Sequence, residues 1–135
     1  MAVTYNATLK TNRMQLVADL IASKVAASST GTASAGTIVI GTSALSGATG
    51  VLATFTLSST PGTVSGAVLT ISGTPLTATA SGTGTAALAE IRNNAGTVIV
   101  SGLTVGTSGT DIIINATAVS TGQTVSLTSG TITHG

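Results

Sequence analysis

"VLATFTLSSTPGTVSGAVLTIS", residues 51–72, is the stretch that decides the fold. Its first seven residues alternate, with Val51, Ala53, Phe55 and Leu57 on one side and Thr54 and Thr56 on the other. A period of two places these sets on opposite faces of a β-strand. The turn "TPGT" follows, where Pro61 and Gly62 suit the central positions of a type II turn, so residues 63–72 are predicted to form the next strand.

The chain from residue 37 onward repeats this pattern of short strands and turns. Of the 17 glycines, 11 are followed directly by threonine, which fits a glycine that turns the chain before a β-branched residue enters a strand. Further strands are predicted at 37–41, 75–80, 86–92, 97–103, 111–119, 123–129 and 131–134. Eight or nine short strands indicate a mainly β fold, an antiparallel β-sandwich of Ig-like or jelly-roll-like type over residues 37–135. A β-solenoid is the rival, but the sequence has no fixed repeat period. The expected core includes Val51, Phe55, Leu57, Ile91 and Val98.

Residues 1–27 differ from the rest, because they hold four of the seven charged side chains and no glycine. The segment "TNRMQLVADLIASKVAAS" predicts one N-terminal α-helix from Thr11, whose hydroxyl is the expected N-cap. "ASSTGTASAG", residues 27–36, has the composition of a flexible linker, which we place at 28–36. The predicted organisation is thus an arm and helix (1–27), a linker (28–36) and a β domain (37–135).

The predicted helix carries an apolar stripe at helical spacing, formed by Leu16, Val17, Leu20, Ile21 and Val25. The stripe could pack on the chain's own sheet or dock on another subunit. A β-sandwich closes its core from its own two inner faces, and the linker favours docking, so these five residues are candidate partner-binding residues. A fragment that begins near Ser34 is then expected to fold without the helix.

Composition excludes several classes of function. A formal net charge of +1, with only 5% charged residues, leaves no basic stripe for nucleic acid. Without cysteine there is neither a disulfide framework nor a thiolate metal site. No apolar run approaches the roughly 18–20 residues of a membrane span, and no signal peptide is visible, so we expect no membrane partner. A weakly charged surface with mean hydropathy +0.60 lacks the repulsion that keeps monomers apart, which favours a homo-oligomeric assembly component.

Catalytic chemistry finds little support in the sequence. General acid–base catalysis needs paired groups in contrasting environments, and the chain offers Asp19, Glu90, Asp111 and His134 with no spacing that brings them together. The motifs of serine hydrolases, zinc proteases and phosphate-binding loops do not occur. We therefore expect no enzyme activity, no cofactor and no metal site.

Glu90 and Arg92 stand out after a long uncharged stretch. Two residues apart on a strand, they share a face, and a hairpin loop "NNAG" at 93–96 would set Glu90 opposite Ile99. One interpretation is a solvated face with an ion pair worth at most about 1 kcal/mol. The other is the rim of an interface whose apolar part is Leu88 and Ile99, which makes these two further candidate partner-binding residues.

The chain resembles a family of small β-rich proteins encoded among the virion genes of tailed bacteriophages. The resemblance lies in "YNATLKTNRMQLVADLIA", "VLATFTLS", "VSGAVLTISG", "GTAALAEIRNNAGTVIVSGLTVG" and "INATAVSTGQTVSLTSGTITHG", which cover nearly the whole sequence. It implies a β-sandwich that is made in the cytoplasm of the bacterial host and assembled into the virion. It supplies no site residues.

Within a virion the resemblance leaves several roles open. The expected role is a capsid decoration or cement protein that binds the shell, formed by the major capsid protein, through its N-terminal segment. A neck or tail structural protein, adaptor- or fibre-associated, is the alternative. A carbohydrate-binding module or a cellular enzyme is a remote alternative, because the chain has one Tyr, one Phe and no Trp to stack on a sugar and no convergent carboxylate pair.

Overall fold

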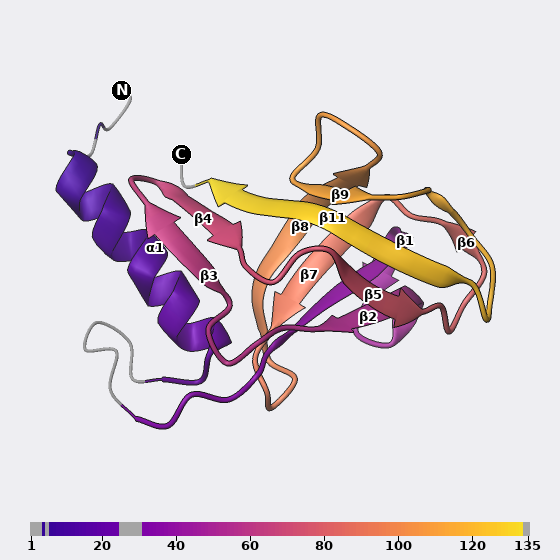
Figure 1. The fold of residues 1–135 in the computed structure, drawn as a ribbon, viewed down its shortest axis with the longest axis horizontal. Helices are drawn as coiled ribbons and strands as arrows, with labels where there is room; N and C mark the ends of the chain where they lie inside the picture. The colour runs from indigo at the N-terminus through magenta and orange to yellow at the C-terminus, as the bar shows by residue number, and fades with distance from the viewer. Residues whose placement is uncertain (1–3, 5, 25–30, 134–135) are drawn as a thin grey trace.

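The structure is a computed structural model that describes residues 4, 6–24 and 31–133. The chain is mainly β with one N-terminal helix, which lies beside β3 and β4 (Figure 1). The elements are α1 (Ala7–Ile21), β1 (Thr37–Ser46), β2 (Thr49–Thr56), β3 (Gly62–Ser65), β4 (Val68–Ile71), β5 (Leu76–Thr79), β6 (Gly84–Thr85), β7 (Leu88–Arg92), β8 (Val98–Gly106), β9 (Ile112–Ile114), β10 (Ala118–Val119) and β11 (Thr124–Thr133).

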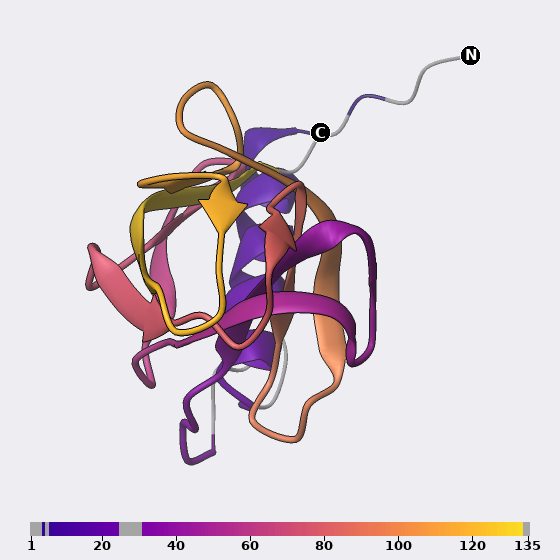
Figure 2. The same cartoon turned by 90° about the vertical axis from the view of Figure 1, so that its right-hand side faces the viewer.

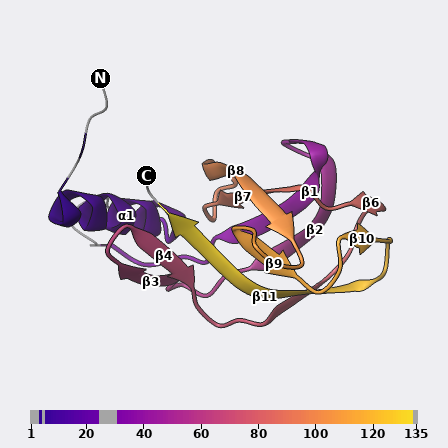
Figure 3. The same ribbon diagram turned by 90° about the horizontal axis from the view of Figure 1, so that it is seen from above.

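Nine of these strands form one mixed, mostly antiparallel open sheet. Its order is β2-β1-β7-β8-β9-β11-β4-β3, and β5 pairs with β11 off this path. Among the described residues, β8 and β9 pair in parallel and the remaining strand pairs are antiparallel. Seen along the long axis, β1, β7 and β8 lie on one side and β11 on the other (Figure 2). The small β10-β6 sheet lies at the end opposite α1 (Figure 3).

The predicted alternation is confirmed in the second half of β2 only, because Leu52 is buried beside Ala53, and Val51, expected in the core, is only half-buried. Phe55 and Leu57 are 0% and 2% exposed, whereas Thr54 and Thr56 face solvent. Ile91 on β7 is also fully buried, as predicted. These residues belong to one continuous core of aliphatic side chains from the strands and from α1, in which Phe55 is the largest buried residue. A period of two thus marks the buried face around Phe55, whereas β1 and β7 bury consecutive residues.

The strand predicted at 63–72 is wrong, because the segment folds back on itself. Gly66 has φ +59°, a left-handed conformation that glycine adopts without steric cost, and it turns the chain between β3 and β4. The type II turn at Pro61-Gly62 is also wrong. Gly62 has no positive φ and pairs with Ile71. A Cβ at Gly62 would lie 2.1 Å from the Thr70 carbonyl oxygen, so glycine is needed there for close approach.

Three other strand predictions differ in extent. The segment predicted as one strand at 111–119 is divided into β9 and β10, and those predicted at 123–129 and 131–134 join into the single β11. Gly130 lies inside β11 and is buried against Ile71 and Ile112, so this glycine marks close packing and not a turn.

The helix begins earlier than predicted. Its N-cap is Asn6, whose side-chain Oδ1 accepts a hydrogen bond of 2.8 Å from the Leu9 amide. Thr11 lies inside the helix, where its hydroxyl donates to the Ala7 carbonyl at 3.0 Å. The N-cap prediction at Thr11 is therefore wrong, because Asn6 offers a better acceptor one turn earlier.

The helix also ends earlier than predicted, at Ile21. Ser23 adopts φ +58°, and its amide donates to the Leu20 carbonyl at 3.1 Å. The Lys24 amide donates to the Asp19 carbonyl at 2.8 Å. These two bonds form a Schellman motif, with serine in the left-handed position that glycine usually takes, and they stop the helix before the predicted stripe is complete.

The inward face of α1 is Met14, Ala18 and Ile21, which are 1%, 6% and 0% exposed and belong to the core. Of the two alternatives for the helix, this face packs on the chain's own strands, against β3, β4 and β8. In the part of the predicted linker that the structure describes, the Ser34 amide donates to the Ala22 carbonyl at 2.8 Å. This bond connects the segment before β1 to the end of the helix.

The predicted register between β7 and β8 is wrong. Ile91 pairs with Val100 and Arg92 with Val98, so β8 has one more residue than β7 at this step, and Ile99 is the unpaired one. A second extra residue lies near Gly102, which has φ +73°. These are β-bulges, and they shift the pairing away from simple alternation. Val98, expected in the core, is 41% exposed as a result.

Candidate functional site

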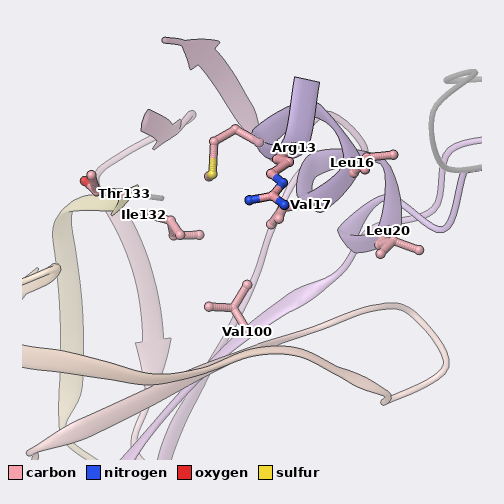
Figure 4. Close-up of a pocket in the computed structure, with 8 residues that line it drawn as sticks. Arg13, Leu16, Val17, Leu20, Val100, Ile132 and Thr133 are labelled. Atoms are coloured by element: carbon pink, nitrogen blue, oxygen red, sulfur yellow. The ribbon is translucent and has the colours of Figure 1, made fainter. Parts of the chain in front are cut away.

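An apolar groove of about 370 Å³ lies between α1 and the neighbouring ends of β8 and β11. It is lined by Arg13, Met14, Leu16, Val17 and Leu20 from the helix, Val100 from β8, and Ile132 and Thr133 from β11. Figure 4 shows the Arg13 and Val17 side chains reaching from the helix toward Val100 and Ile132. The groove is concave and its lining is almost wholly apolar, which makes it the candidate site.

The groove exists because β8 and β11 diverge. The short β9 joins them, pairing with β8 at Val105 and Gly106 and with β11 between Leu127 and Gly130. Beyond β9, toward the helix, no strand of the described chain lies between β8 and β11. α1 lies across this gap and closes it in part with Met14, which is 1% exposed.

The helix presents one face to the groove. Arg13, Leu16, Val17 and Leu20 follow the spacing i, i+3, i+4, i+7, which places them along a single side of a helix. Leu20 is 41% exposed, a high value for a leucine, whereas Val17 is partly buried against the core. The apolar face is therefore open to solvent along the groove.

The structure divides the predicted apolar stripe. Leu16, Val17 and Leu20 line the groove, and Ile21 is fully buried in the core. Val25 lies outside the described residues. The predicted stripe therefore includes three of the five helix residues that line the groove, and it lacks Arg13 and Met14. Sequence reasoning also missed Val100, Ile132 and Thr133, which come from distant strands and carry no local signal.

Leu88 and Ile99 are not brought together. Leu88 is half-buried and pairs with Thr104, five positions along β8 from Ile99. At about 3.4 Å per residue this separation is roughly 17 Å. Ile99 is half-buried and packs against the core. The two residues therefore do not form the single apolar patch that the simple hairpin register predicts.

The Glu90–Arg92 pair is more buried than a solvated face would be. Arg92 donates to Glu90 Oε2 through a terminal nitrogen at 2.8 Å and through Nε at 3.2 Å. The same guanidinium donates to the Gly47 carbonyl at 2.7 Å. Glu90 is only 9% exposed. The pair thus fastens β7 to the turn between β1 and β2, which is a structural arrangement.

The other carboxylates also have structural partners. Asp19 is 2% exposed and accepts from the Gln15 side chain at 3.0 Å. Asp111 Oδ2 accepts from the amide and the hydroxyl of Thr104, at 3.0 and 3.1 Å. The Asp19 bond lies within α1, whereas the Asp111 bonds connect the segment before β9 to β8. His134 lies outside the described residues.

Two classes of site receive no support from the described part of the chain. Residues 4, 6–24 and 31–133 contain no cluster of three or more His, Asp or Glu side chains that could bind a metal ion. Among the same residues, no helix has the length and apolar character of a membrane span.

Comparison with known proteins gives no relative. The chain matches no protein-family model, no curated protein and no solved structure. The resemblance to phage virion proteins therefore stays a prediction from the sequence.

Proposed function

We propose that this chain is a structural component of a tailed-phage virion, a capsid decoration or cement protein that binds the shell through its N-terminal helix. The observation that carries the proposal is the open apolar groove beside α1. The open apolar lining, with an exposed leucine in a chain that has only 5% charged residues, favours association with a partner here. The sequence resemblance to virion proteins supplies the class of partner.

The groove is adequate for subunit attachment. Leu16, Val17 and Leu20 are each worth about 1.5–3 kcal/mol when fully buried, and all three are only partly buried in the isolated chain. Complete burial of these three side chains by a partner contributes several kcal/mol to the binding free energy. The loss of translational and side-chain freedom on binding reduces this contribution. Many weak identical contacts then add up on a symmetric shell.

The sandwich architecture is part of the same proposal. The Ser81 amide, just after β5, donates to the Leu52 carbonyl of β2 at 2.8 Å. This bond supports a closed arrangement in which the β2-β1-β7-β8 strands face the β5-β11 strands across one core. Nuclear Overhauser contacts between β2 and β5 side chains are expected, and their absence would contradict the sandwich.

The decisive experiment is quantitative mass spectrometry of purified particles from the phage that encodes the chain. A copy number that follows the capsid lattice is expected for a decoration protein. A copy number equal to the number of subunits in one ring would instead place the chain at the neck or tail. Absence from the particles would overturn the virion proposal. Sedimentation of the purified chain tests the expected homo-oligomer.

A further inference from the structure

We propose that residues 34–36 form a clasp that fixes the end of α1 to the strands, so that the helix and the sheet meet a partner as one rigid body. The rival arrangement is a helix tethered by a flexible linker, which the composition of residues 28–36 predicts. The clasp is a property of the isolated chain. Only its consequence for attachment through the groove rests on the proposed function.

The clasp is bonded to the helix at one end and to the strands at the other. The Ser34 amide donates to the Ala22 carbonyl, just after α1, at 2.8 Å. Two residues later, the Gly36 carbonyl accepts from the Leu57 amide at 2.9 Å, which extends the pairing of β1 with β2 by one residue. Ala22 and Leu57 are 3% and 2% exposed, so both bonds reach residues of the core. Backbone groups with fixed partners two residues apart leave this segment little freedom to swing.

A third bond holds the middle of the clasp. The Asn94 side chain, in the turn between β7 and β8, donates through Nδ2 to the Ala35 carbonyl at 3.1 Å. Asn94 is exposed, so water competes for this bond and it is the weakest of the three. The three residues of the clasp are therefore bonded to the helix end, to the β7–β8 turn and to the end of β2.

Gly36 lets the helix end and β7 approach each other closely. A Cβ at this buried position would lie 2.6 Å from the Arg92 carbonyl oxygen and 2.8 Å from the Ile21 carbonyl oxygen. Arg92 is the last residue of β7 and Ile21 is the last residue of α1. Both oxygens belong to the backbone, so neither can move without moving its element. Only glycine fits between them, and any side chain here forces the helix away from the strand.

A fixed helix changes the cost of binding through the groove. A tethered helix loses conformational freedom when it docks, and this loss weakens association. With the clasp in place, Val17 and Leu20 hold their positions beside Val100 before any partner arrives. The groove is thus presented preformed, and binding needs no prior docking of the helix.

Hydrogen exchange of the unmodified full chain is the first test. We expect the Ala18 and Ile21 amides of α1 to have protection factors within about tenfold of that of the Phe55 amide on β2, because a clasped helix opens only together with the strands. Protection in α1 that is more than about tenfold lower would overturn the inference, because the helix would then leave the sheet by itself.

Gly36→Ala tests the close approach, with Gly84→Ala as its control. A Cβ at Gly84 would meet only the ends of the Thr42 and Leu52 side chains, at 3.1 and 3.4 Å, so this control is mild. We expect Gly36→Ala to lower protection in α1 at least about tenfold relative to Leu127 on β11, whereas Gly84→Ala should leave this ratio unchanged. An equal loss in helix and strand, or no loss, would overturn the role of Gly36 in the clasp.

Asn94→Ala decides the matter should Gly36→Ala fail to fold. Its control is Asn115→Ala, because Asn115 is also exposed and also bonds a backbone group, the Ser126 amide at 3.0 Å. We expect Asn94→Ala to lower protection in α1 about twofold to tenfold and Asn115→Ala to leave it unchanged. Equal effects of the two variants would overturn the clasp. Because these measurements use the isolated chain, their failure is distinct from absence of the chain from virions, which would overturn the proposed function and leave the clasp standing.

Discussion

The strands around Phe55 and the groove beside α1 are both built from aliphatic side chains, but one is closed and the other is open. Phe55 is fully buried beneath paired strands, with Ile38 opposite it on β1. Leu20 keeps 41% of its surface exposed, because β8 and β11 diverge where the helix lies. The difference indicates that the two regions have different roles: the closed core stabilises the fold, and the open groove favours association.

The largest expected effect comes from removing the helix. A fragment that starts at Ser34 loses Met14 and Ile21, which are 1% and 0% exposed in the core. We expect this fragment to lose its cooperative thermal melt or to aggregate, since the gap between β8 and β11 then opens to water. A cooperative melt with β-type circular dichroism would contradict this. It would show that residues 37–135 form a separate domain behind the linker predicted at 28–36.

Phe55→Ala tests the closed region directly. The ring is the largest fully buried side chain, and its aliphatic neighbours fill a cavity poorly, so we expect a loss of about 3–5 kcal/mol in the free energy of unfolding. Urea titration measures it. Val98→Ala is the control, because Val98 is 41% exposed on β8 and its truncation should change stability by no more than about 0.5 kcal/mol. Similar losses in both variants would mean that the β2 register is wrong.

An intermediate effect is expected for the ion pair on β7. Glu90→Gln removes the charge that accepts two bonds from Arg92, and Glu90 is only 9% exposed, so we expect a loss of about 1.5–3 kcal/mol. Arg92→Lys keeps the charge but cannot reproduce the forked geometry, and it should cost part of this amount. The coupling from a double-mutant cycle in urea measures the pair. A coupling energy near zero would support the interpretation in which Glu90 and Arg92 lie on a solvated face and their ion pair adds little stability.

The sequence predicted features that depend on one strand or one helical face. The alternation around Phe55 predicts its burial in β2, and the helical spacing predicts Leu16, Val17 and Leu20, which form part of the helical side of the groove. Both follow from local periodicity, which secondary structure preserves. A reader of the sequence alone can find such features because each lies within one element.

Features that depend on pairing between elements were not predictable. The bulges that leave Ile99 unpaired and expose Val98 have no reliable local signal, because Gly102 could equally mark a turn. Gly66 and Gly62 look alike in the sequence, yet the first turns the chain and the second permits close contact with Thr70. The strand half of the groove depends on where β9 stops pairing, which is a property of the whole sheet.

The smallest expected effect sharpens the comparison within a single helix. Leu20 and Ile21 are adjacent in sequence, but Leu20 is 41% exposed on the groove and Ile21 is 0% exposed in the core. Leu20→Ala should change the free energy of unfolding by no more than about 0.5 kcal/mol, because alanine is a good helix former and little buried area is lost. Ile21→Ala should cost about 2–5 kcal/mol, because it leaves a cavity beneath the helix. Urea titration of both variants decides the matter. If Leu20→Ala were as costly as Ile21→Ala, the groove would be closed in solution by the chain itself, and the open face that the binding proposal needs would not exist.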